Sequence, residues 1–140
     1  MFDNLLNLVK QHSGDAIINN NAIPNEKNDE AIHSTTTSIV DTLKSQVAGG
    51  NLNSIMDMFK GGNTTNVSNT LNTNVSGDLM KKFNLDQTTA TNVASSLLPN
   101  VMDSFVKKTN DPKDNSFDLQ EIMKSLGGNS GMLGGLGNLF

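Results

Sequence analysis

The side chains best suited to chemistry in this 140-residue chain lie in the run NDPKDNSFDLQE, at positions 110–121. Oxygen-bearing groups stand where a calcium loop of about 12 residues has several of its ligands: Asn110, Asp114, Asp118 and Glu121. A glutamate at the last loop position binds calcium with both carboxylate oxygens. The four residues are therefore a candidate metal site.

The loop departs from the calcium-binding pattern in three places. Pro112 supplies no side-chain oxygen, Asn110 replaces the usual first Asp, and Asn115 stands where the pattern has Gly. The same run also fits a helix start, with Asp118 as N-cap and Glu121 completing a capping box. We favour the capping interpretation over calcium binding, and expect no metal or other cofactor.

His12 and His33 are the two histidines, the residue type best suited to act as a base near neutral pH. Each stands among polar or small residues along the chain. No serine lies in a recognisable nucleophile elbow, and the turn at Gly61-Gly62 lacks the Lys and spacing of a phosphate loop. We expect solvated or capping histidines, and a protein that is not an enzyme.

Composition narrows the classes of partner. The net charge is -4 and the isoelectric point is near 4.9. All ten basic residues are Lys, so the guanidinium fork that reads phosphates and guanine edges is missing, which argues against nucleic acid. Cys is absent, which excludes disulfides and thiolate catalysis.

The first apolar stretch, MFDNLLNLV, carries Asp3 in place of a basic leader region and is too short to cross a bilayer. We interpret it as a mature N-terminus, and expect a cytoplasmic protein without a membrane partner.

The stretch 85–105 is the strongest predicted core helix. A period of 3.6 residues places one apolar face on it and a polar face opposite. The apolar face consists of Ala90, Ala94, Leu97, Leu98, Val101, Met102 and Phe105.

Further helices are predicted before it. An amphipathic stripe begins at Phe2 and is broken at Gly14, and a short helix follows at 16–18. A long helix is expected from Asn25, a possible N-cap after Pro24, to about Val47, ended by Gly49-Gly50. A short helix over 52–59 follows.

The same order of apolar positions and glycine stops recurs after a shift of 62 residues, which predicts an internal duplication. Val67 and Leu71 then stand at the positions of Leu5 and Val9, and Phe105 stands at that of Leu43. After a five-residue insertion, Leu119, Ile122, Met123, Leu126 and Gly127-Gly128 repeat the short helix and its glycines. Helices of equal length with Gly stops that match by chance are the alternative.

The two copies differ at three places. Asp86 is a strong N-cap candidate in the second copy. Pro99 predicts either a kink near Leu98 or a new helix that starts at Pro99. Under the shift of 62, Thr35 and Thr36 correspond to Leu97 and Leu98, so fewer apolar side chains are expected on the core face of the first copy.

The run FNLDQTTATNVASSLLPNVMDSFVKK, followed by a short acidic insertion, FDLQEIMKSLGG and a Gly-rich apolar tail, resembles the bacterial YidB-like family. The resemblance covers the second copy and the tail well and the first copy loosely. It implies an all-helical bacterial protein with no established catalytic residues, and favours an oligomer.

The tail GGNSGMLGGLGNLF carries an apolar stripe at helical spacing: Met132, Leu133, Leu136, Leu139 and Phe140. Its four interior glycines each cost about 1 kcal/mol in a helix, so it cannot form a firm helix alone. It is either a flexible end or a segment that orders against a neighbouring subunit.

These observations predict an all-α fold, a compact multi-helix bundle built from two tandem helical repeats of about 62 residues. Residues 1–128 form one domain, with repeats at 1–62 and 63–128, and residues 129–140 form the Gly-rich tail. We expect a non-catalytic homo-oligomer that acts by self-association. The alternative is a carrier of a small apolar ligand, suggested by Met56, Met58, Met80, Met102 and Met123.

Overall fold

The computed structural model describes residues 2–50, 52–60 and 65–111, and within these ranges it is helical without a β-strand. The helices are α1 (Phe2–His12), α2 (Asn28–Ala48), α3 (Leu52–Phe59), α4 (Thr65–Phe83) and α5 (Gln87–Thr109). A π-helical turn at Gly14–Ile18 and a 3-10 turn at Asn25–Lys27 connect α1 to α2. The prediction of an all-α fold is confirmed for this part of the chain.

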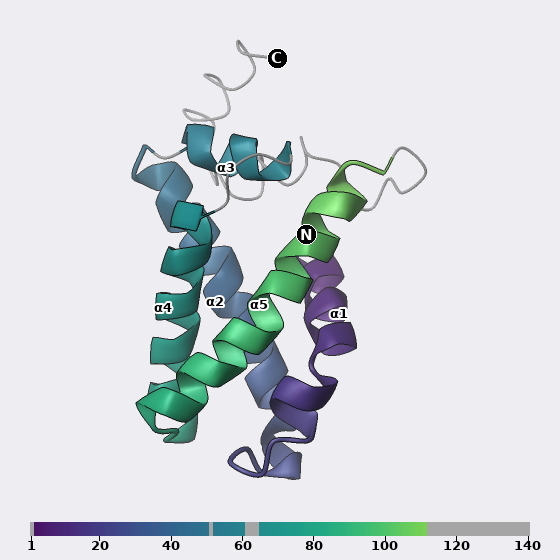
Figure 1. Ribbon diagram of the computed structural model, residues 1–140, viewed down its shortest axis with the longest axis vertical. Helices are drawn as coiled ribbons and strands as arrows, with labels where there is room; N and C mark the ends of the chain where they lie inside the picture. Colours follow the sequence, from purple (N-terminus) through teal and green to yellow (C-terminus); the bar gives the residue numbers. More distant parts are fainter. Residues whose placement is uncertain (1, 51, 61–64, 112–140) are drawn as a thin grey trace.

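The four longer helices form a bundle (Figure 1). Helix α1 packs against α2 and α5, and α4 packs against the same two helices. Helix α3 lies across one end of the bundle, where it contacts α2, α4 and α5.

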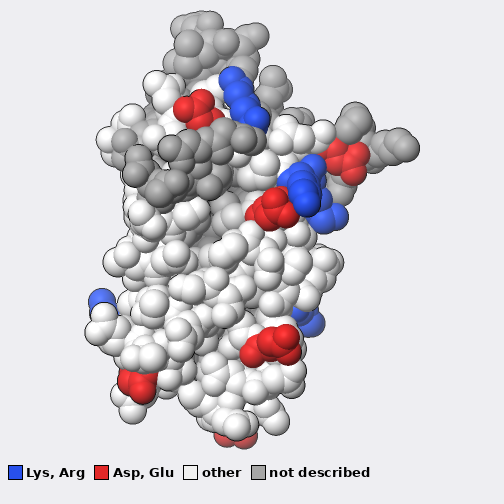
Figure 2. Space-filling view, in the orientation of Figure 1, with Lys and Arg blue, Asp and Glu red and all other residues white. Residues whose placement is uncertain are grey.

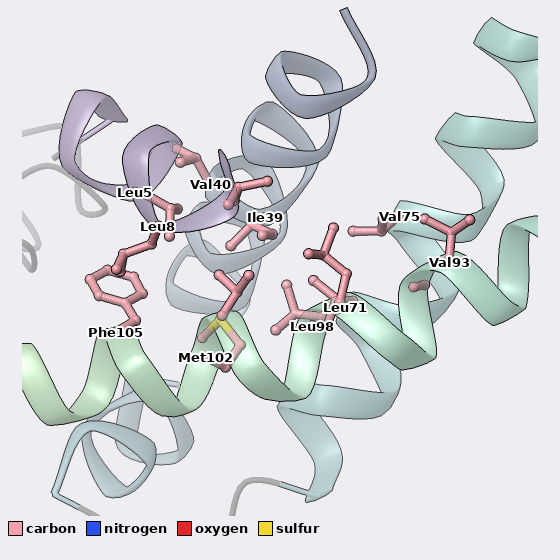
Figure 3. Close-up of a cluster of buried hydrophobic side chains, with 14 of the residues drawn as sticks. Leu5, Leu8, Ile39, Val40, Leu71, Val75, Val93, Leu98, Met102 and Phe105 are labelled. Carbon is pink, nitrogen blue, oxygen red and sulfur yellow. The ribbon is translucent and has the colours of Figure 1, made fainter. Parts of the chain in front are cut away.

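Helix α5 buries the face that its sequence predicts. Ala90, Ala94, Leu97, Leu98, Val101, Met102 and Phe105 are all buried, and Val93 joins them. Figure 3 shows α5 side chains meeting Leu5 and Leu8 of α1, Ile39 of α2 and Leu71 of α4 in one core. Burying a side chain of this size stabilises the fold by about 1.5–3 kcal/mol relative to leaving it exposed.

The start of α5 is capped as predicted, since Asp86 accepts a hydrogen bond from the backbone N–H of Thr89 at 2.7 Å. The start of α2 is different, and the Asn25 N-cap prediction is wrong. Pro24 is the residue before the 3-10 turn, and no side chain caps that turn. Asn25 Oδ1 instead accepts from Asn28 Nδ2 at 3.5 Å.

Pro99 lies inside α5, which runs on from Gln87 to Thr109, so no new helix starts there. The predicted end of α2 is confirmed: α2 ends at Ala48, Gly49 is the C-cap, and Gly50 has a φ of 90° that favours glycine. Thr35 and Thr36 are as buried as their counterparts Leu97 and Leu98.

Helix bounds in the two halves of the chain correspond only in part under the shift of 62, since α4 ends at Phe83, which moves back to position 21, whereas α1 ends at His12. Moved back by 62 positions, α5 spans 25–47, where the 3-10 turn begins at Asn25 and α2 ends at Ala48. Moved back likewise, α4 begins at position 3, beside the start of α1 at Phe2. Descent from a duplication stays a prediction.

Candidate functional site

The structure brings His12, the last residue of α1, to Ser104 on α5, 92 positions away. His12 Nε2 lies 2.9 Å from Ser104 Oγ, and both side chains are partly buried. The expected solvated or capping role is therefore wrong for His12, which is partly buried and hydrogen-bonded between two helices. His33, the other histidine, is exposed on α2, where its ring lies 5.1 Å from that of Phe2.

A hydrogen-bonded Ser and His is one requirement of nucleophilic catalysis. A pocket of about 490 Å³ lies beside His12 and is also lined by Asp15, Ser96 and Asn100. A working site also needs a group that orients the His and donors for the oxyanion. Within the described ranges, no carboxylate is hydrogen-bonded to His12.

A second polar site lies between α2 and α4. Ser38 donates a hydrogen bond to the carboxylate of Asp78, and Asn74 Nδ2 donates to Thr42 Oγ1 at 2.9 Å. The Thr42 hydroxyl donates in turn to the carbonyl of Ser38 at 2.7 Å. Ser38 and Thr42 are buried, so these bonds satisfy hydroxyl groups that have little access to water.

This second site opens into a pocket of about 310 Å³, which Asp41 and Lys81 also line. The pocket contains two carboxylates, Asp41 and Asp78, and one ammonium group, that of Lys81. The Ser38 hydroxyl and the Asp78 carboxylate form a hydrogen-bonded pair here, and no histidine is among the residues that line the pocket. Throughout the described residues, no three Asp, Glu or His side chains gather closely enough to hold a metal ion.

The two interhelical hydrogen bonds occupy matching positions. Under the shift of 62, His12 corresponds to Asn74 and Ser104 to Thr42. Each bond joins the first long helix of one half to the last long helix of the other, at 2.9 Å. An interhelical bond forms here with either pair of residues, so packing alone accounts for the contact between His12 and Ser104. The shift of 62 relates the two pairs to each other, but it gives no signal that either pair is in contact.

Of the calcium-loop candidates, the structure describes Asn110, the C-cap of α5. Its Nδ2 donates to the carbonyl of Phe59 at 2.8 Å and to that of Val106 at 3.0 Å, so its amide joins α5 to the end of α3. Asp114, Asp118 and Glu121 lie outside the described residues. The choice between cap and calcium ligand therefore stays a prediction.

The predicted self-association residues, Met132, Leu133, Leu136, Leu139 and Phe140, also lie outside the described residues. Among the side chains that the structure describes, Ile18 is the exposed large hydrophobic residue, at 42%. The face in Figure 2 is mostly uncharged, with Lys and Asp or Glu side chains in small separate groups.

The described methionines belong to the core or its edge. Met58 and Met102 are buried, while Met56 and Met80 are partly buried and pack against the core. Met123 lies outside the described residues. Three pockets formed by described residues are lined mainly by polar side chains, which do not suit an apolar ligand.

Comparison with protein-family models, with curated proteins and with solved structures finds no match to this chain. Within the described residues, no helix combines the length and the apolar character needed to cross a membrane.

Proposed function

We propose that this chain is a non-catalytic helical protein that acts by self-association, with the apolar stripe of residues 132–140 as its connector. The observation that carries the proposal is the distribution of apolar side chains. The described helices bury theirs in one core, and Ile18 alone among their large hydrophobic residues is well exposed. The apolar residues of the tail, 132–140, are the further apolar group in the sequence that does not belong to the described core.

The character of the polar groups supports a non-catalytic role. The hydrogen bond of His12 has a counterpart made by Asn74, a residue that does not act as a base. A neutral surface of Asn, Thr and Ser is also compatible with contact between identical chains, since like charges facing each other would oppose it. The internal duplication and the bacterial YidB-like resemblance remain part of this proposal, as does a cytosolic location.

The test is a variant of the full chain in which Leu133, Leu136, Leu139 and Phe140 are replaced by Ser. Mass in solution, measured by light scattering, should fall to that of one chain, while the helical circular dichroism stays unchanged. A matched control replaces Ser130 and Asn138 by Ala in the same tail and should keep the parent mass. If the Ser variant keeps the parent mass, the tail is not the connector.

A carrier of a small apolar ligand is the second candidate, and Met56 and Met80 at the edge of the core favour it, because flexible thioethers suit adaptable sites. Native mass spectrometry of freshly purified protein distinguishes the two functions. A carrier retains a small-molecule adduct, whereas an association module shows the mass of bare chains.

A further inference from the structure

The pocket between α2 and α4 carries charged groups of both signs. Asp41 on α2, and Asp78 and Lys81 on α4, line its volume of about 310 Å³. The buried Ser38 hydroxyl donates to one carboxylate oxygen of Asp78. Among the described residues, no ion pair joins Lys81 to either carboxylate. The pocket therefore presents two carboxylates and an ammonium group that do not neutralise one another.

Asp41 differs from its counterpart where α1 crosses α5. Under the shift of 62 it corresponds to Asp103, whose carboxylate pairs with Lys107 at 3.0 Å. Lys107 corresponds to Ser45, which lines the pocket. Asp41 thus lacks the lysine that Asp103 has one turn further along its helix, and its carboxylate is available to a ligand.

Lys81 differs from its counterpart in a similar way. It corresponds to Asn19, whose side-chain amide donates to Asp15 Oδ1 at 3.3 Å. Asp15 corresponds to Gly77, so the residue one turn before Lys81 has no side chain. The polar groups that are paired locally in the first half of the chain are therefore left without such partners at this pocket.

Gly77 lies inside α4, where glycine is less favourable than alanine. Close packing does not require it, because a Cβ at this position would meet no atom within 4 Å. Its backbone does not require it either, since Gly50 is the glycine with a positive φ among the described residues. Gly77 lines the pocket, and the absence of a side chain there leaves the pocket open.

We propose that this pocket binds a small zwitterion, a free α-amino acid with a short polar side chain. The ligand's ammonium group suits Asp41 and the oxygen of Asp78 that Ser38 leaves free, and its carboxylate suits Lys81. The remaining lining is mostly hydroxyl and amide groups, which suit a polar side chain. A volume of about 310 Å³ is at the lower end for ligand pockets and fits a small molecule. This goes beyond the proposed function, because it needs neither self-association nor residues 132–140.

The test is a titration of the full 15N-labelled chain with millimolar L-serine, which carries both charges and a hydroxyl group. Saturable shifts of backbone amide signals should concentrate at residues 38–45 and 73–81. Ethanolamine lacks the carboxylate of serine, and 3-hydroxypropanoate lacks its ammonium group. Each should bind about tenfold more weakly or worse, because a charged hydrogen bond is lost. No saturable shift with L-serine, or equal binding of either analogue, would overturn the proposal.

Variants of the lining test the assignment of each charge. Asp41→Asn and Lys81→Gln should each weaken L-serine binding by about tenfold or more. Gly77→Gln, which adds a side chain without a charge, should also weaken it by obstructing the pocket. Asp103→Asn is the matched control and should leave the affinity unchanged, with helical circular dichroism confirming that all four variants fold. Equal affinity in the parent and the two charge variants, or an equal loss in the control, would contradict the proposal.

Discussion

Thr35 and Thr36 are adjacent on α2 and equally buried, yet their hydroxyl groups differ. Thr36 Oγ1 donates to the carbonyl of Ile32 at 2.9 Å, whereas Thr35 Oγ1 has no hydrogen-bond partner. Leaving such a group buried without a partner costs about 1–3 kcal/mol. Thr35 thus retains a polar group where the second half has Leu97.

We predict that Thr35→Val raises the free energy of unfolding by about 1 kcal/mol or more, because it removes a desolvated hydroxyl at nearly constant volume. Urea denaturation measures the change. Thr36→Val is the matched control, and it should gain less, since its hydroxyl already has a partner. An equal gain in both variants would show that the missing hydrogen bond is not the cause.

Asp86 stabilises the start of α5 as a charged cap. Hydrogen bonds from Thr89 lower the pKa of this carboxyl below its ordinary value. A lowered pKa in the folded state means that the cap's contribution is present at neutral pH and is lost as the pH falls through that lowered value.

We therefore expect Asp86→Ala to lower the thermal midpoint at pH 7 and Asp86→Asn to retain most of it, since Asn also caps helices. The difference between Asp86 and Ala should shrink in acid. An NMR titration of the carboxyl that gives an ordinary or raised pKa would contradict this account.

At the scale of elements, sequence periodicity predicted α5 and its buried face well, because a helix that packs on one side repeats its apolar residues every 3.6 positions. It predicted the start of α2 poorly. Local propensities do not separate a 3-10 turn from the first turn of an α-helix, and Asn25 lies in such a turn. For Pro99, the sequence left two outcomes open, a kink near Leu98 or a new helix that starts at Pro99, because the neighbouring residues fit both.

Pro99 is exposed within an unbroken α5 and deprives the carbonyl of Ser95 of its helical N–H donor. We predict that Pro99→Ala stabilises the protein by about 1–3 kcal/mol, measured by urea denaturation. Ser95→Ala, on the exposed side of the same helix, controls for helix propensity. A loss of stability in Pro99→Ala would mean that α5 needs the proline's geometry to cross the bundle.

At the scale of the whole molecule, the contacts between helices could not be predicted from the sequence. His12 meets Ser104 because α1 and α5 cross at that level, and a separation of 92 residues gives no local signal. The helices and their apolar faces could be predicted from the sequence. Which helices contact one another depends on how all the apolar faces pack together. The shift of 62 relates the two crossings to each other, but it gives no signal that either pair of helices is in contact.

Self-association is the central claim, and the mass of the full chain in solution tests it most directly. Light scattering coupled to size exclusion, at two protein concentrations, gives that mass without a label or variant. We predict a multiple of the 15.0 kDa chain mass, rising or constant with concentration. A single chain of 15.0 kDa at both concentrations would contradict the claim.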